Sequence, residues 1–198
     1  MTKYWSEVSL MSILCLFVIS VSYASASVPF QADYVQMMDG EEYTGKYYAG
    51  PDGIRIEGIM DGQEQLMIIN FEKGVTWVVM KSEGMYMEMP FNPEDSEEFR
   101  SPCAQLNVKK NMVGREKMQG RKVEKWHCEL AMGGTDQIWF DPRLKAAIRT
   151  LESSGEVFEL RNIKEGRLSK DLFQLPAGYT KMSMPGLEEG AYGQGMDY

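Results

Sequence analysis

The residues of this sequence that could do chemistry are thioethers rather than acid–base groups. The only histidine among the 198 residues is His127, and no motif places a nucleophile beside a base. The sequence has no P-loop, GxGxxG, HExxH, GxSxG or EF-hand pattern, and its carboxylates form no pair typical of a catalytic cleft. We expect His127 to face solvent from a strand. We therefore predict that the protein is not an enzyme, with no catalytic residue and no cofactor.

Methionine is the unusual feature, with 16 in the chain. Met85, Met87 and Met89 alternate with other residues, so a strand would place three thioethers on one face. Met182 and Met184 repeat this spacing near the C-terminus. Unbranched, polarizable side chains adapt to irregular apolar shapes, which suits a surface that accepts flexible acyl chains.

The methionine pattern predicts a hydrophobic ligand, such as a lipid or acyl chain, on a concave sheet face. Two alternatives remain open: the methionines fill a core, or their thioethers bind Cu(I). A Cu(I) carrier usually adds histidines or a denser MxxM array, and the sequence has neither, so no metal site is assigned. The predicted ligand-binding residues are Met85, Met87, Met89, Ile54, Ile56 and Trp77.

The N-terminus predicts export. Lys3 precedes an apolar run over 10–21, and Ala24-Ser25-Ala26 resembles a cleavage site. The run is shorter than the roughly 20 residues that span a bilayer as a helix, which disfavours a retained anchor. We expect a signal peptide over 1–26, one domain over 27–184 and a flexible tail over 185–198, in the periplasm or secreted.

Cys103 and Cys128 would be the two cysteines of the mature chain, since Cys15 lies in the predicted signal peptide. An even number of cysteines in an oxidising compartment favours one disulfide. Two free thiols, or half of a metal site, are the alternatives. The sequence has no CxxC motif to favour a metal site.

The charge of the chain excludes two classes of partner. Its formal net charge is −8, whereas nucleic acids and anionic membrane surfaces both require a basic face. The partners that remain are a hydrophobic small molecule and a protein of the cell envelope.

Short alternating segments between Gly, Asp and Asn turns predict a meander of antiparallel strands. One helix is expected over 92–106, because Asn92 can cap it, Pro93 suits its first turn and acidic residues follow. The expected strands span 30–38, 41–48, 54–58, 65–70, 75–80, 85–89, 113–118, 121–132, 137–140, 146–151 and 157–163.

Several segments together resemble a known family. The most specific are MYMEMP at 85–90, GRKVEKWHC at 120–128, NIKEG at 162–166 and LFQLPAGY at 172–179. With these segments the chain resembles the DUF4412 family, which is itself similar to the periplasmic lipoprotein carrier LolA and its receptor LolB. The resemblance extends from about residue 30 to residue 184.

This resemblance implies a mainly β fold: a curved antiparallel sheet forming an incomplete half β-barrel, with one or a few helices covering its open mouth. It also implies an apolar cavity and a role in lipid or lipoprotein handling in the periplasm. The expected function is thus non-enzymatic binding of a hydrophobic ligand. A structural or interaction protein of the cell envelope, with a packed core and no ligand, is the alternative.

Overall fold

The computed structural model is one large, open sheet. The predicted signal peptide, residues 1–26, and the predicted tail, residues 185–198, lie outside the described residues. No helix within the described part is long and apolar enough to cross a membrane. The structure describes residues 27–60, 62–97, 99–103, 109–131 and 133–182.

The described residues form twelve strands and three short 3-10 helices. The strands are β1 (Phe30–Met38), β2 (Glu41–Gly50), β3 (Gly53–Met60), β4 (Gln63–Asn70), β5 (Val75–Met80), β6 (Met85–Pro90), β7 (Lys109–Met118), β8 (Arg121–Glu129), β9 (Thr135–Asp141), β10 (Ala146–Leu151), β11 (Val157–Glu165) and β12 (Thr180–Lys181). The 3-10 helices are η1 (Lys81–Glu83), η2 (Pro93–Glu97) and η3 (Lys170–Phe173).

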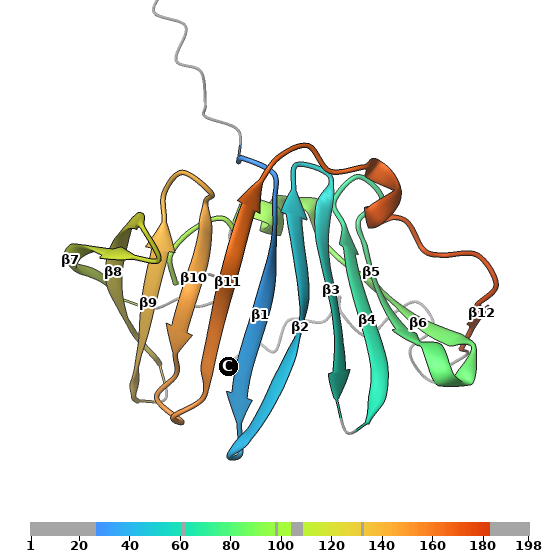
Figure 1. The fold of residues 1–198 in the computed structure, drawn as a ribbon, viewed down its shortest axis with the longest axis horizontal. Coiled ribbons are helices and arrows are strands. Elements are labelled where there is room, and N and C mark those ends of the chain that lie inside the picture. The colour runs from blue at the N-terminus through green and yellow to red at the C-terminus, as the bar shows by residue number, and fades with distance from the viewer. Residues whose placement is uncertain (1–26, 61, 98, 104–108, 132, 183–198) are drawn as a thin grey trace, which may run out of the picture.

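The strand order is β12-β6-β5-β4-β3-β2-β1-β11-β10-β9-β8-β7 (Figure 1). It consists of two meanders, β1 to β6 and β7 to β11, which meet where β1 pairs antiparallel with β11. Short β12 adds a parallel pair at the outer edge of β6. The prediction of a mainly β, curved and unclosed antiparallel sheet is confirmed.

Two-residue turns set the register of two hairpins. Asp39 and Gly40 join β1 to β2, and Gln119 and Gly120 join β7 to β8. All four have positive φ, between 51° and 82°. Hairpin turns with positive φ at both central residues match the natural twist of the strands, which explains why a glycine takes the second position.

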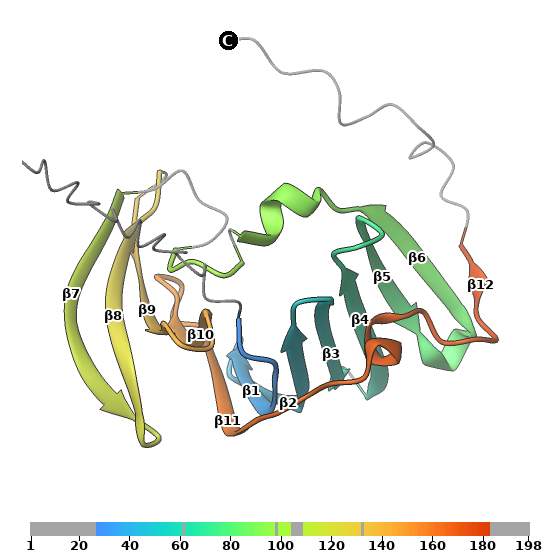
Figure 2. The same cartoon turned by 90° about the horizontal axis from the view of Figure 1, so that it is seen from above.

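The sheet bends into a trough (Figure 2). Residues 91–97 and 99–103, which we call the strap, lie on the open, concave side, beginning directly after β6. Helix η3 lies on the opposite, convex side, against β3 and β4. The two sides of the sheet therefore have different covers.

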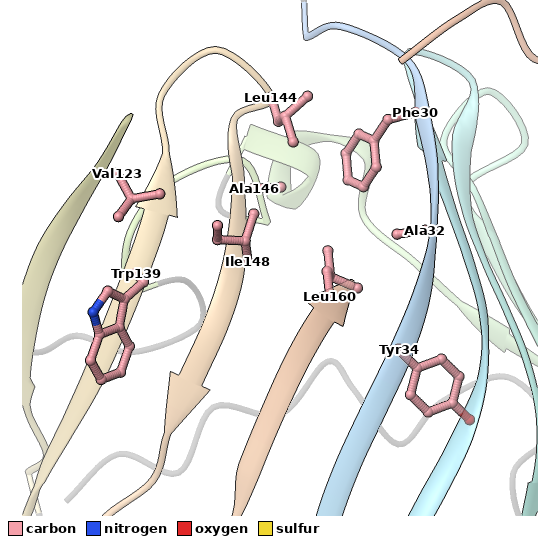
Figure 3. Close-up of a cluster of buried hydrophobic side chains, with 9 residues drawn as sticks. All are labelled: Phe30, Ala32, Tyr34, Val123, Trp139, Leu144, Ala146, Ile148 and Leu160. Atoms are coloured by element: carbon pink, nitrogen blue, oxygen red, sulfur yellow. The ribbon is translucent and has the colours of Figure 1, made fainter. Parts of the chain in front are cut away.

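The largest buried cluster lies around the junction of the two meanders (Figure 3). Phe30 stacks on Tyr47 with ring centroids 5.9 Å apart, and Tyr34 stacks on Phe158 at 6.0 Å. Tyr34 lies directly over Gly58, where an added Cβ would be 2.0 Å from the phenol oxygen. Only glycine permits this approach. The buried members are Phe30, Ala32, Tyr34, Val123, Trp139, Leu144, Ala146, Ile148 and Leu160.

The helix predicted over 92–106 was wrong in type and extent. The described part of that range contains the 3-10 helix η2, followed by turns at 99–103, and residues 104–108 lie outside the description. Pro102 explains why no helix runs through that position, because proline lacks the amide donor and clashes with the preceding helical turn. Cys103 also has a positive φ of 57°.

Candidate functional site

Strand register places most of the predicted ligand-binding residues on one face. Ile56 of β3 lies opposite Met67 of β4, which lies opposite Val78 of β5, which lies opposite Met87 of β6. Residues paired in register share a face of the sheet. This cross-strand row therefore crosses four strands on a single side.

Parallel rows extend the same surface. Ile54 lies opposite Ile69 in one row, and Met80 lies opposite Met85 in another. Met67 and, from the strap, Phe91 and Phe99 all pack against the buried cluster of Ile54, Ile69 and Phe71, which identifies this side as the concave one (Figure 2). We call the part lying on β4 to β6 the methionine face; its members are Met67, Val78, Met80, Met85, Met87 and Met89.

The methionine face is partly open. Met89 is 39% exposed, and Met67, Met80, Met85 and Met87 are half-buried. Apolar side chains on an exposed edge of a concave face could contact an apolar ligand without rearrangement of the fold.

Trp77 lies on the opposite, convex face. Its register partners are Ile68 and Glu88, and its indole N–H donates to the Glu88 carboxylate at 2.8 Å. It packs in the convex cluster with Leu66 and Phe173. The structure therefore brings together Met85, Met87, Met89, Ile54 and Ile56, and separates Trp77 from them.

Three methionines near this face were not among the predicted site residues. Met67 and Met80 come from β4 and β5, and Met182 follows β12, donating its backbone N–H to the Tyr86 carbonyl at 2.8 Å. The alternation of Met67 with Ile69 in β4 was a usable signal. Placing Met67 on the same face as the methionines of β5 and β6, however, required the pairing register between those strands, which is not a local signal.

A charged contact joins β12 to the edge of β6. The Lys181 ammonium donates to Glu88 at 2.7 Å, on the same face as Trp77. Hydrogen bonds from Lys181 and then from Trp77 lower the pKa of Glu88 below its ordinary value of 4.5, although burial opposes them.

The strap is joined to both halves of the sheet. Phe91 follows β6 and stacks on Phe71 at 5.6 Å, and the Arg100 guanidinium lies 5.0 Å from the Phe71 ring. At the far end, Cys103 forms a disulfide with Cys128 of β8, with Cα atoms 5.6 Å apart. The strap thus crosses the concave side from β6 to β8.

A small crevice of about 20 Å³ lies beneath the strap. Phe30, Tyr47, Ile54 and Phe99 contribute to its lining. Burial raises the pKa of Tyr47 to about 12, so this phenol stays neutral at physiological pH. The crevice is far smaller than the 300–1,000 Å³, roughly, of sites that enclose a small molecule. A ligand at the methionine face would therefore lie on the open surface beside the strap.

Larger depressions have charged side chains in their lining. One of about 620 Å³ is lined by residues that include Asp33, Lys46, Glu57 and Arg161, and several of these charges are paired with each other or with neighbours. His127 lies in β8 opposite Asn111 and Gln137. The described residues contain no group of three His, Cys, Asp or Glu that could hold a metal ion.

Solved structures share this fold at low sequence identity. An uncharacterized conserved protein from Thermus thermophilus is 16% identical, with a TM-score of 0.58, covering 79% of this chain and 90% of the other. MucB from the Pseudomonas aeruginosa MucA/MucB complex is 15% identical at a TM-score of 0.50, covering 81% of this chain. Such identities show the fold alone.

The matched proteins differ in how much of their own length is shared. The chain spans 60% of the length of the matched Pseudomonas protein. The LolA superfamily protein NE2245 from Nitrosomonas europaea also matches, at 13% identity and a TM-score of 0.42, covering 75% of this chain and 91% of the other. No curated protein sequence matches.

Sequence comparison defines the relationship more directly than these structures do. The sequence model of a protein family, described as "Domain of unknown function (DUF4412)", matches residues 34–144, which is more than half of the chain. The matched region begins in β1 and ends just before β10, so it includes the methionine face, the strap and both cysteines of the disulfide. The chain therefore belongs to the DUF4412 family.

Proposed function

We propose that this protein is an exported, non-enzymatic binding protein that holds a flexible hydrophobic ligand, such as a lipid acyl chain, against the methionine face. One observation carries the proposal: five half-buried or exposed methionines share the concave side of β4, β5 and β6. Their thioethers can adjust to a ligand whose shape varies along its length.

The energetics suit an acyl chain. Each methylene group removed from water contributes about 0.8 kcal/mol, so ten methylenes contribute on the order of 8 kcal/mol before the costs of immobilisation. Neighbouring strands lie about 4.8 Å apart, which makes a three-strand surface wide enough to line one side of a single chain. Ile54 and Ile69 continue this surface under the strap.

The compartment is inferred from the disulfide. Cys103 and Cys128 are both buried, and structural disulfides persist in oxidising compartments such as the periplasm. This supports the predicted export signal. A role in envelope lipid or lipoprotein handling follows as part of the proposal.

Native mass spectrometry of protein purified without detergent tests the proposal. We expect lipid-sized adducts that organic solvent extracts, and we expect Met87→Glu to lose them because the charge would lie in the apolar contact. Ile59→Glu is the matched control. Ile59 is 57% exposed and lies opposite Glu64, outside the methionine face.

The other outcomes also discriminate. Protein that remains bare after incubation with phospholipid vesicles and with acylated peptide would contradict the proposal and favour an envelope interaction protein without a ligand. Retention of adducts in both variants would place the ligand elsewhere. Stoichiometric Cu(I) binding that Met87→Glu abolishes, without any lipid adduct, would favour thioether coordination.

A further inference from the structure

Strand β7 forms one of the two outer edges of the sheet (Figure 1). It is ten residues long and pairs with β8 on its inner side. Within the described residues, no strand pairs with its outer side. An edge strand presents backbone N–H and C=O groups that an incoming extended chain can pair with.

The edge is strongly basic in an acidic protein. β7 carries Lys109, Lys110, Arg115 and Lys117 against one acid, Glu116, whereas the whole chain has a net charge of −8. Two of its cations are neutralised by β8: Lys109 pairs with Glu129 and Arg115 with Glu124, each at 3.1 Å. Lys110 and Lys117 have no carboxylate partner in the described part of the chain.

A like-charge pair strengthens this pattern. Lys117 lies directly opposite Lys122 in the β7–β8 hairpin, and both side chains are exposed. Like charges placed directly opposite each other destabilise a strand pair. Neither ammonium forms an ion pair with a described carboxylate that would offset the repulsion, so the hairpin itself gains nothing from this arrangement.

A bulge aligns the cations with an apolar contact. The register shifts between Met112 and Gly114, so that Met112 faces Trp126 while Arg115 faces Glu124. Trp126 and Glu124 are two residues apart in β8 and share a face. One face of β7 therefore presents Lys110, Met112, Arg115 and Lys117. Met112 is 41% exposed and Val113 is 44% exposed.

Lysines and bulges commonly protect edges against pairing with a second copy. That function applies here, since two basic β7 strands would repel each other. The same charges are complementary to an acidic strand, and the exposed Met112 and Val113 offer it apolar contact. Main-chain hydrogen bonds supply affinity and side chains supply specificity in this mode of recognition.

We propose that β7 is the docking edge for an extended acidic segment of a partner protein, which adds to the sheet as a further strand. Acidic residues of that segment lie opposite Lys110 and Lys117, and an apolar residue contacts Met112. The strap pins β8 to the concave side through Cys103 and Cys128, so the added strand extends the wall of the trough. This proposal is independent of the hydrophobic ligand.

A synthetic probe tests the docking edge. A fluorescent peptide of five Glu-Val repeats should bind at low salt, and hydrogen exchange should show new protection of β7 amides. The double variant K110E/K117E should weaken binding at least tenfold. K164E/R167E, which makes the same charge change at two exposed residues outside β7, should leave binding within about twofold.

Two further peptides separate pairing from simple attraction. A Glu-Val peptide N-methylated at every second residue keeps its charge but loses backbone donors, so it should bind at least tenfold more weakly. Equal binding of that peptide, equal binding of a Lys-Val peptide, or an unchanged affinity in K110E/K117E would overturn the proposal. Protection of β7 that depends on protein concentration without any peptide would assign the edge to a second copy instead.

Discussion

The two faces of β4, β5 and β6 come from alternating residues of the same strands, yet they are closed in different ways. On the convex face, Leu66, Ile68 and Val79 are fully buried beneath Phe173, which η3 brings over the sheet. On the concave face, Met87 and its neighbours stay partly exposed beside the strap. The apolar side chains of the convex face are therefore fully covered, whereas those of the concave face still expose apolar surface that a ligand could bury.

The difference in residue type matches this difference in closure. The convex face uses branched and aromatic side chains with few rotamers, which suit a fixed cover. The concave face uses thioethers, which repack easily. Alternation along a strand lets one sheet combine a rigid support with an adaptable surface.

The largest effect should come from the convex cover. Phe173→Ala should lower the free energy of unfolding by about 3–5 kcal/mol, because it empties a fully buried site. Met87→Ala should cost clearly less, since that side chain is only half-buried. Urea unfolding of both variants measures the difference. Equal losses of unfolding free energy in the two variants would show that the convex and concave faces contribute equally to stability, contrary to the difference in burial described above.

Removal of the disulfide should affect the concave side selectively. In the chain-entropy model, opening a loop of 25 residues costs about 3.5 kcal/mol. The double variant C103S/C128S should therefore unfold at lower urea concentration, and the amides of 99–103 should exchange faster. Protection of η3 should not change below the unfolding transition. Loss of protection at η3 as well would mean that the two covers are coupled.

The glycines under the central aromatic rings should be the next most sensitive positions. Gly58→Ala should destabilise by about 1–3 kcal/mol, because the new methyl group would lie 2.0 Å from the Tyr34 hydroxyl oxygen. Adding Tyr34→Phe should recover part of the loss by removing that oxygen. Gly114→Ala is a suitable comparison, since nothing lies within 4 Å of its added Cβ. Similar costs at both glycines would contradict the close packing.

The smallest effect concerns pH. Because Lys181 and Trp77 lower the pKa of Glu88 in the folded state, the contact contributes fully above the ordinary value of 4.5 and is lost as pH falls through the lowered pKa. The protection factor of the Met182 amide, which bonds to Tyr86, should therefore fall on acidification, after correction for the pH dependence of intrinsic exchange. Glu88→Gln should have a lower protection factor than wild type at pH 7, and that factor should not change with pH. A wild-type protection factor that is insensitive to acid would remove this role.

The strands were predictable because alternation and turn residues are local signals. The expected spans 30–38, 75–80 and 146–151 match β1, β5 and β10 to the residue. Face assignment was harder. Trp77 was grouped with the methionines, although alternation in β5 separates it from Val78, because which face meets Met87 depends on the register between two strands.

The covers of the sheet were the least predictable parts. Residues 92–106 carry good helix-start signals, but Pro102 and the packing of Phe91 and Phe99 on the sheet override them. The segment containing Phe173 could be recognised as conspicuous, yet nothing local indicates that it lies on the convex side. Covers depend on contacts distant in sequence, such as the hydrogen bond of 2.7 Å from the Asn70 side chain to the Phe173 carbonyl.

The position of β11 beside β1 has a consequence for how the chain folds. Each meander can form from neighbouring hairpins, but the seam between them joins Phe30 to Glu165 and requires almost the whole domain to be present. Contacts of such long sequence separation slow folding, because the intervening loop must close before they form. A chain that emerges N-terminus first would hold β1 with one open side until β11 arrives. Its vulnerability to aggregation would therefore be greatest during synthesis, and would end when the seam closes.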